Sequence, residues 1–313
     1  HDAQFDYYGK RLATCSSDRS IKVYDVSGDE YSYIAELKGH EGPVWEVTWA
    51  HPKFGSLLAS CSYDRRVLVH KETAGNTWSV VHTYEGHKSS VNGIAWAPHE
   101  LGASLAAASA DGSVSVMTHK DDASWETAII QDCSAGVNSV SWAPYHHVGC
   151  QAGDQVVARL ATAGVDGNVR VYKRVGSDGA WELDDNGLLK GYSASARDVA
   201  WAPSSGMPVN VMATAWENGV VVIWRQAASG GEWVKQELPA FSAPAWRVSW
   251  STTGNLLAVS CGDNSATLWK ETLAGGWEQV SDITPDGAAA PAADSSYTSE
   301  TQESTAPESR RLA

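Results

Sequence analysis

The sequence predicts an all-β protein, a six-bladed β-propeller with an open ring, followed by a disordered C-terminal tail. Three features lead to this prediction. A strand cassette recurs six times, two columns of tryptophan keep step with it, and the order of the strands leaves none over to join the two ends of the ring. Repeats of this length that each contain four short strands are typical of propeller blades.

The recurring cassette consists of small residues, a turn residue and an alternating strand that ends six positions later. The first copy reads ATCSSDRSIKVY and ends at Tyr24, and the last reads AVSCGDNSATLW and ends at Trp269. The turn residues, to which we assign a structural role, are Asp18, Asp64, Asp111, Asp166, Asn218 and Asp263.

Tryptophans form two sets in phase with this cassette. The first set closes strands of the VWEVTW type and comprises Trp49, Trp96, Trp142, Trp201 and Trp250, which are 47, 46, 59 and 49 residues apart. The second set follows the cassette strand and comprises Trp78, Trp125, Trp181, Trp233 and Trp277. Because one Trp buries roughly 150 to 250 Å², we expect the first set to fill the core between blades.

Each copy contains four runs of alternating hydrophobicity. In the second copy these are VWEVTW (44–49), SLLASCS (56–62), RVLVH (66–70) and WSVVHTYE (78–85). Period-two runs bounded by Gly, Asp, Asn or Pro predict strands, and a single sheet must stack on its neighbours to cover both faces. The predicted blades are about 1–37, 38–85, 86–131, 132–190, 191–238 and 239–283, which form one domain before the predicted tail, 284–313.

The phase of the copies predicts the open ring. Aligning Gly9 with Gly55 places Ala3 opposite Trp49, so residues 1–5 become the end of an innermost strand. The last strand, WEQVSDI, is the outermost strand of the sixth copy, so no strand remains to close the ring. The exposed edges could accept a partner's strands. We expect Ala3, Phe5, Trp277, Val280 and Ile283 to lie at the edges of this gap and to contact the partner.

Composition favours an intracellular binding module. A net charge of −14 argues against a general nucleic-acid or anionic-membrane surface, and the sequence has neither an apolar run of membrane-spanning length nor a visible signal peptide, although it begins at His1. Two of the five cysteines, Cys15 and Cys61, share a repeat column and Cys261 lies one position away. We interpret them as small core residues in a reducing compartment.

Two histidines follow Gly immediately before an innermost strand. We expect His40 and His87 to hydrogen-bond the turn Asp of their own blade rather than to catalyse a reaction. Asp184 and Asp185 lie in DDNG, a composition typical of a solvated turn.

The fourth copy carries an insertion, APYHHVGCQAGDQVV, which we expect to be a surface loop. Its HHxxC group, His146, His147 and Cys150, lacks the further ligand that a zinc site needs. The sequence therefore predicts no catalytic residue, cofactor or metal.

The repeat columns resemble the WD-repeat family. The Gly-His pairs at 39–40 and 86–87 and the strand-closing tryptophans at 224 and 269 carry this resemblance, although the Asp that usually follows the Trp is missing. Segments such as DYYGKRLATCSSDRSIKVYD, GHEGPVWEVTWAHPKFG and NLLAVSCGDNSATLWKE resemble more closely the Sec-thirteen family of small propellers, over residues 1 to about 283.

The resemblance implies a non-catalytic scaffold subunit of the COPII vesicle outer coat and of the nuclear pore Y-complex. Its partners would be a Sec-thirty-one-like coat protein or a Y-complex nucleoporin, each donating a β blade in trans beside a helical solenoid. It implies localisation at endoplasmic-reticulum exit sites and the nuclear pore, and in an amino-acid signalling complex at the lysosome or vacuole. The alternative is a peptide-binding or adaptor propeller, including the related Seh-one nucleoporin or a nutrient-signalling subunit.

Overall fold

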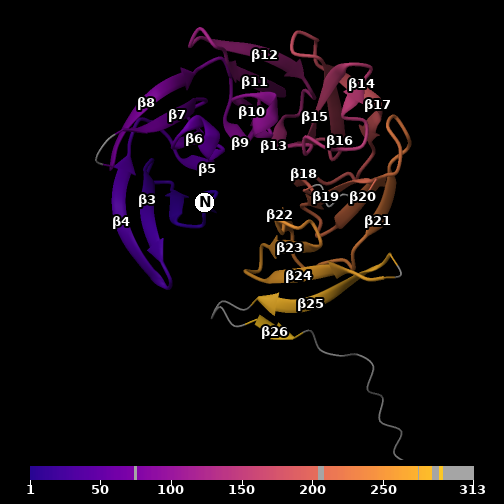
Figure 1. Cartoon of the computed structure of the whole chain (residues 1–313). Helices are drawn as coiled ribbons and strands as arrows, with labels where there is room; N and C mark the ends of the chain where they lie inside the picture. Colours follow the sequence, from indigo (N-terminus) through magenta and orange to yellow (C-terminus); the bar gives the residue numbers. More distant parts are fainter. Residues whose placement is uncertain (74–75, 204–207, 274, 284–288, 292–313) are drawn as a thin grey trace, which may run out of the picture.

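The computed structural model describes residues 1–73, 76–203, 208–273, 275–283 and 289–291 of the 313-residue chain. These residues form the predicted all-β, six-bladed propeller, with the blades arranged around a central channel (Figure 1). Within these ranges, no helix is long and apolar enough to cross a membrane.

Each blade is an antiparallel sheet whose strands run in chain order from the channel outward. Blades 1 to 3 contain β1 (Asp2–Phe5), β2 (Arg11–Cys15), β3 (Ile21–Ser27) and β4 (Glu30–Leu37); β5 (Val44–Trp49), β6 (Leu57–Ser62), β7 (Val67–Thr73) and β8 (Thr77–Tyr84); and β9 (Val91–Trp96), β10 (Ser104–Ser109), β11 (Ser113–His119) and β12 (Trp125–Gln131). Blades 4 to 6 contain β13 (Val137–Trp142), β15 (Gln155–Gly164), β16 (Val169–Val175) and β17 (Glu182–Leu189); β18 (Ala196–Trp201), β19 (Asn210–Trp216), β20 (Val221–Gln226) and β21 (Val234–Glu237); and β22 (Ala245–Trp250), β23 (Leu256–Cys261), β24 (Ala266–Glu271) and β25 (Trp277–Ile283).

The turn residues of the cassette stabilise the hairpin between the second and third strands. In all six copies the turn side chain accepts the backbone N–H two residues further on, from Ser20, Arg66, Ser113, Asn168, Val220 and Ser265, at 2.9–3.3 Å. The intervening residue has positive φ in every copy, for example 72° at Arg19 and 87° at Gly112. This geometry explains why Gly or Asn follows the turn residue in four copies.

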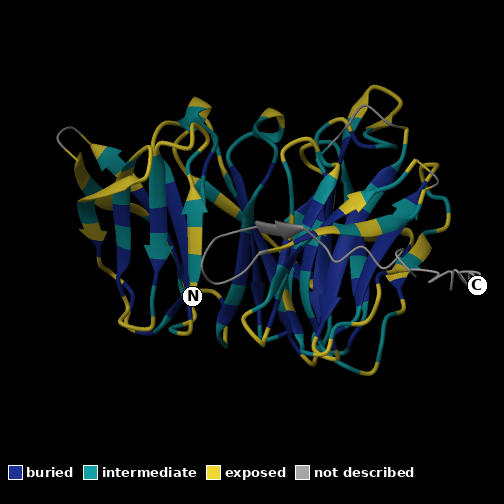
Figure 2. Ribbon diagram, turned by 90° about the horizontal axis from the view of Figure 1, so that it is seen from below, coloured by how far each residue is buried: buried dark blue, intermediate teal, exposed yellow. Residues whose placement is uncertain are grey.

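The hydrophobic core consists of five clusters, each shared by two neighbouring blades. Buried residues occupy the middle of the sheets and exposed residues the turns (Figure 2). The strand-closing tryptophans lie in these clusters, and Trp49, Trp96, Trp142 and Trp250 each donate their indole N–H to a carbonyl of the preceding blade's innermost strand at 2.9–3.2 Å. The indoles therefore join one blade to the next.

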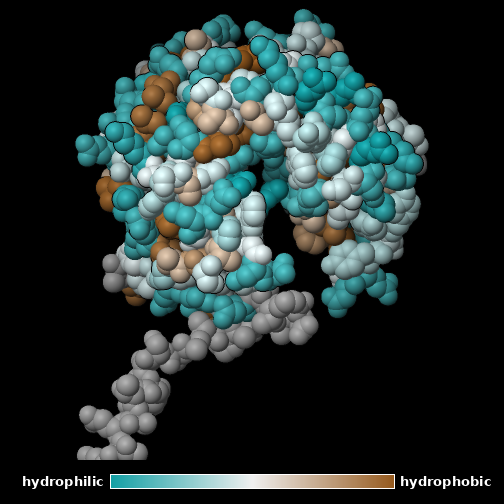
Figure 3. Space-filling view, turned by 180° about the vertical axis from the view of Figure 1, so that it is seen from behind, coloured by the Kyte–Doolittle hydropathy of each residue, from teal (hydrophilic) through white to brown (hydrophobic). Residues whose placement is uncertain are grey.

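Blades 1 and 6 are not joined in this way. None of the five clusters of described residues combines side chains from these two blades. A notch runs from the outside of the ring to the central channel between them (Figure 3). The prediction of an open ring is confirmed.

The register of β1 corrects the sequence alignment. Phe5 pairs with Leu12 as Trp49 pairs with Leu58, so Phe5 rather than Ala3 occupies the tryptophan position. The connection after β1 is two residues shorter than the one after β5, which contains a 3-10 turn at Pro52–Phe54. Gly9 and Gly55 both have positive φ and lie two residues before the second strand, but Gly9 is four residues after the end of β1 and Gly55 is six after the end of β5.

Asp184 differs from the sequence interpretation, whereas the blade-4 insertion lies at the surface, as expected, but has more structure than a loop. Asp184 is buried within β17, where its carboxylate lies 3.0 Å from the Arg159 guanidinium, so it does not belong to a solvated turn. The blade-4 insertion forms a short strand, β14 (Gln151–Ala152), against β15, and the side chain of Asn210 in blade 5 binds both the N–H and the C=O of Val148. The insertion is therefore anchored rather than free.

The predicted tail, 284–313, lies mostly outside the described residues. Its described part, β26 (Ala289–Pro291), pairs with β25 as an additional outer strand of blade 6, so these three residues are strand and not coil.

Candidate partner-binding gap

Each blade has two faces with different side chains. The face toward the preceding blade, the leading face, carries a row made of the strand-closing Trp, a second-strand residue and a third-strand residue, which pair directly with one another. The second-strand members are Leu58, Leu105, Leu160, Met212 and Leu257, and all five are 0 % exposed. The third-strand members are His70, Met117, Tyr172, Trp224 and Trp269, which are at most 6 % exposed.

The leading face of blade 1 keeps these bulky residues but has no blade against it. Phe5, Leu12 and Tyr24 form the equivalent row, and Tyr31 takes the position that Trp78 has in blade 2. Phe5 and Tyr31 are 53 % and 57 % exposed, and Leu12 and Tyr24 are only half-buried. All four residues are therefore more exposed to solvent than their equivalents in blades 2 to 6.

The face toward the next blade, the trailing face, consists of small and β-branched residues. In blade 2 these are Ala59 and Cys61 on the second strand, paired with Val69 and Val67 on the third. Their equivalents in blades 1 to 5 are at most 4 % exposed.

Blade 6 presents its trailing face to the other side of the gap. The corresponding residues are Ala258, Ser260, Ala266 and Leu268. All four are half-buried, unlike the equivalents in every other blade. The gap is thus lined on both sides by surfaces of the kind that the ring buries elsewhere.

An ionic contact spans the inner end of the gap. Arg247 on β22 places its Nη1 3.1 Å from Glu46 Oε1 in blade 2 and 3.6 Å from Asp2 Oδ1 in blade 1. The same carboxylates accept backbone N–H groups, since Asp2 binds the amide of Val47 and Glu46 that of Ile94. The contact therefore ties blade 6 to the inner strands across the channel, while the sheet faces stay apart.

Burial and the neighbouring charges shift the pKa values of Glu46 and Arg247 in opposite directions. Burial raises the pKa of Glu46 to about 7, although the nearby Arg247 guanidinium lowers it. Burial would lower the pKa of Arg247, but the carboxylates of Glu46, Asp2 and Asp198 raise it above its usual value. Arg247 is therefore the stable cation of this cluster, and Glu46 is the group that titrates near neutrality.

The histidines singled out in the sequence hold the turns of their own blades. His40 Nδ1 lies 2.9 Å from Asp64 Oδ2, and His87 Nδ1 lies 3.1 Å from Asp111 Oδ2. Burial alone would raise the pKa of Asp64, but hydrogen bonds from His40 and from backbone amides lower it to about 2. Both rings are buried and fully engaged, because each second nitrogen meets a Ser hydroxyl at 2.9 Å.

The five residues expected at the gap edges lie in different places. Ala3 and Phe5 are exposed on the leading face of blade 1. Val280, 40 % exposed, sits at a bulge of β25, in the position that Ile34 has on β4. Ile283 ends β25 opposite Ala266. Trp277, in contrast, packs on Trp250 in the cluster between blades 5 and 6, with ring centroids 5.6 Å apart, so it does not face the gap.

The sequence reasoning missed most of the gap surface. Leu12, Tyr24 and Tyr31 were not singled out, nor was the small-residue row of blade 6. The signal that could have identified them is the repeat column itself, since Leu12, Tyr24 and the blade-6 row align with positions that are buried in the other blades, and Tyr31 aligns with the tryptophan column of Trp78.

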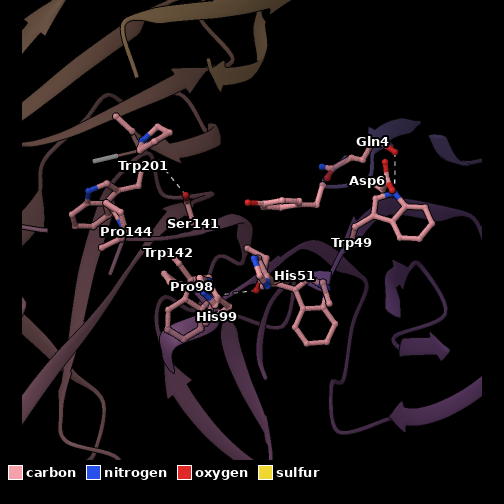
Figure 4. A pocket seen from close by; sticks show the side chains of 18 of the residues that line it. Gln4, Asp6, Trp49, His51, Pro98, His99, Ser141, Trp142, Pro144 and Trp201 are labelled. Carbon is pink, nitrogen blue, oxygen red and sulfur yellow. Dashed lines mark hydrogen bonds between the residues drawn. The ribbon is translucent and has the colours of Figure 1, made fainter. Parts of the chain in front are cut away.

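A second hollow lies at the mouth of the channel. Its volume is about 510 Å³, and its rim contains Pro98, Pro144 and the stacked rings of His51 and His99, whose centroids are 3.9 Å apart (Figure 4). The residues that the structure describes contain no group of three His, Cys, Asp or Glu side chains placed to hold a metal. His147 of the HHxxC segment instead binds the Pro144 carbonyl through Nδ1.

Sequence comparisons agree with this geometry. The repeat family WD40 (WD domain, G-beta repeat) matches residues 1–25, 31–71, 78–116, 126–173 and 234–270. The chain is similar to "Protein transport protein SEC13" of Mycosarcoma maydis, with 42 % identity over 333 residues, 90 % of this chain and 92 % of the relative. It is 47 % identical over 301 residues to "Protein SEC13 homolog" of Dictyostelium discoideum, covering 90 % and 94 %, and 43 % identical over 293 residues to that of Drosophila melanogaster, covering 90 % and 80 %.

Proposed function

The chain belongs to the SEC13 family of WD-repeat transport proteins, and on that premise we propose that it is a non-catalytic scaffold subunit whose open ring accepts a β blade donated in trans by a larger partner. The observation that carries the proposal is the pair of uncovered faces. Blade 1 turns Phe5, Leu12 and Tyr24 toward the gap, and blade 6 turns the Ala258–Leu268 row toward it. Exposed surfaces with the composition of an internal core are typical of obligate interfaces.

The energetic argument is that one inserted blade covers two faces at once. Burying a side chain such as Phe or Leu is worth roughly 1.5 to 3 kcal/mol relative to leaving it exposed. The bulky residues of the blade-1 face, together with Leu268 of blade 6, contribute in this way and offset the cost of immobilising two proteins. A blade inserted between two sheets therefore gains more than a strand added to one edge.

We further propose the cellular setting that family membership suggests. The donated blade would come from a Sec-thirty-one-like protein of the COPII outer coat, or from a nucleoporin of the Y-complex, next to a helical solenoid. In that setting the propeller stiffens the junction between partner domains at endoplasmic-reticulum exit sites or at the nuclear pore. The curated relatives are named as protein transport proteins, which supports this setting.

The test combines isolation with a matched pair of variants. Tagged protein is purified from its own cytosol and cross-linked, and the peptides joined to β1, β3 and β24 are identified by mass spectrometry. We expect them to come from a β segment of a larger, different protein. Peptides from this polypeptide itself, or recovery of a lone monomer, would contradict the proposal.

A matched pair of variants tests whether the partner binds at the gap or elsewhere on the surface. Tyr31→Ala removes a gap-facing aromatic ring, whereas Tyr63→Ala removes an equally exposed one, 62 % against 57 %, from a turn of blade 2. Only Tyr31→Ala should weaken retention of the partner. Equal retention by the two variants would place the interface elsewhere.

An adaptor function is the second candidate, favoured by the hollow at the channel mouth. Its proline and histidine rim could hold an extended peptide. Substitution His99→Ala at that rim would then reduce binding of the isolated partner, while Tyr31→Ala would have no effect. The scaffold function expects the reverse.

A further inference from the structure

We propose that the donated blade is polarised by side-chain size, with bulky residues facing blade 6 and small residues facing blade 1. This inference rests on the proposed function, because it describes the partner that the gap accepts. It specifies the partner's chemistry and its orientation in the ring.

The five internal junctions follow one packing rule. In each, bulky side chains of the later blade pack on small ones of the earlier blade. Between blades 2 and 3, for example, Leu105 and Met117 of blade 3 share a cluster with Ala59 and Cys61 of blade 2. The second-strand residues of both facing blades are buried at each junction. Because protein interiors are close-packed, a larger side chain on one blade requires a smaller one on the other.

The two walls of the gap are the two halves of such a junction. Blade 1 offers the bulky half, with Phe5, Leu12, Tyr24 and Tyr31. Blade 6 offers the small half, in which two positions differ from the other blades: Ala266 stands where they have Val or Ile and is smaller, whereas Leu268 also stands where they have Val or Ile. A blade that fits between them must present small residues to blade 1 and large ones to blade 6.

A blade with reversed polarity would fail on both sides. Bulk against Tyr24 and Leu12 would overpack that wall, and small residues against Ala258 and Ala266 would leave cavities. Size polarity therefore selects one of the two ways in which a blade can enter the ring.

The chain itself supplies a suitable probe. Its internal blades already have the required polarity, so a second copy of residues 38–85 is inserted between Ile283 and Thr284 of the full chain. Ile283 pairs with Ala266 as Leu37 pairs with Ile21, so the copy follows β25 at the spacing that blade 2 has after β4. The inserted copy should occupy the gap.

Amide hydrogen exchange measures that occupation. We expect the inserted copy to slow exchange in β1 and β24 by about tenfold or more relative to the unmodified chain. The control copy carries Leu58→Ala together with Ala59→Leu. This double substitution keeps the composition, but it places the smaller side chain on the leading face and the larger one on the trailing face at these two positions. The control copy should leave exchange in β1 and β24 unchanged. Equal protection by both copies, or by neither, would overturn the inference.

A second variant keeps the test independent of whether the control copy folds. Ala266→Leu adds bulk to the half-buried wall of blade 6 in the otherwise unmodified chain. We expect unaltered thermal unfolding of the free protein and at least about a tenfold loss of affinity for the partner isolated with it. Unaltered affinity would refute the claim that the donated blade places bulky side chains against blade 6.

The outcomes also separate this inference from the proposed function. If the inserted copy protects the gap but no blade-donating protein is recovered from cells, the proposed function fails and the size rule stands. If a partner cross-links to the gap and the inverted copy protects as well as the normal one, the size rule fails alone. Protection already present in the unmodified chain, and lost when residues 284–313 are removed, would show that the tail fills the gap and would overturn both.

Discussion

Two leucines in the same repeat column provide the sharpest test of the open ring. Leu58 is 0 % exposed between blades 1 and 2, whereas Leu12, its equivalent in blade 1, faces the gap and is half-buried. Truncating a buried leucine costs about 2 to 5 kcal/mol, because transfer energy is lost and a cavity remains. Leu58→Ala should therefore lower the free energy of unfolding by about 3 kcal/mol.

Leu12→Ala should cost the free chain only about 1 kcal/mol, since the side chain is already partly in contact with water and no closed cavity forms. The remaining 2 kcal/mol or so should appear as lost affinity once a donated blade covers the site, a rise in Kd of about 30-fold. Urea unfolding measures the first quantity and titration calorimetry with the isolated partner the second. Leu183→Ala, at a leucine 46 % exposed in blade 4, is the surface control and should leave affinity unchanged.

Either of two results would refute this reasoning. If Leu12→Ala destabilised the free chain as much as Leu58→Ala, the gap would be closed in solution. If it left the partner's affinity unchanged, the partner would bind away from this face.

Three further predictions concern the core, the channel and the tail. Trp201→Ala should cost roughly 3 to 5 kcal/mol in urea unfolding, and Trp246→Ala, at a 43 % exposed site, about 1 kcal/mol; similar costs would mean that the tryptophan column is not core. Because the pKa of Glu46 is raised from 4.5 to about 7, the folded state keeps a proton that the unfolded state loses, so stability falls as pH rises through that window, by at most about 3 kcal/mol. Glu46→Gln should remove this decline, and an identical pH profile for variant and parent would contradict the assignment. Deleting residues 292–313, which follow β26, should leave the thermal midpoint and partner binding unchanged, and lost binding would move the interface to the tail.

The sequence predicted the ring well because its strongest signals are local. The turn residues and the period-two strands each depend on contacts within one blade, as the bond from Ser20 N–H to Asp18 illustrates. The tryptophan spacing adds the distance between blades. Together these features were enough to predict six blades and an open ring.

The errors came from features that the repeat does not fix. A glycine marks a turn but not its distance from the strand, so Gly9 misplaced Ala3 against Trp49. A bulge between Leu268 and Trp269 shifts the register of β25, so alternation alone cannot say which face Trp277 occupies.

Long-range pairing is equally invisible in a local composition. The composition of DDNG alone predicts a turn. In the fold, Arg159, more than twenty residues earlier in the sequence, forms an ion pair with Asp184. A charged pair of this kind is buried only because another strand of the blade, here β15 on the far side of β16 from β17, supplies the opposite charge.

The chemistry of the blade-1 face fits a surface that is exposed at one time and covered at another. Blade 1 has Tyr31 where blade 2 has Trp78, and Phe5 where the other blades have Trp. Tyrosine combines a large apolar ring with a hydroxyl at its tip, so it can contact water when the gap is open and contribute apolar area when the gap is filled. Arg247 meanwhile holds the inner strands in place with contacts to Glu46 and Asp2 that leave the sheet faces free. These contacts keep the ring open in the partner-free protein. The residues of the blade-1 face that are exposed in that state supply the contact area in the complex with a donated blade.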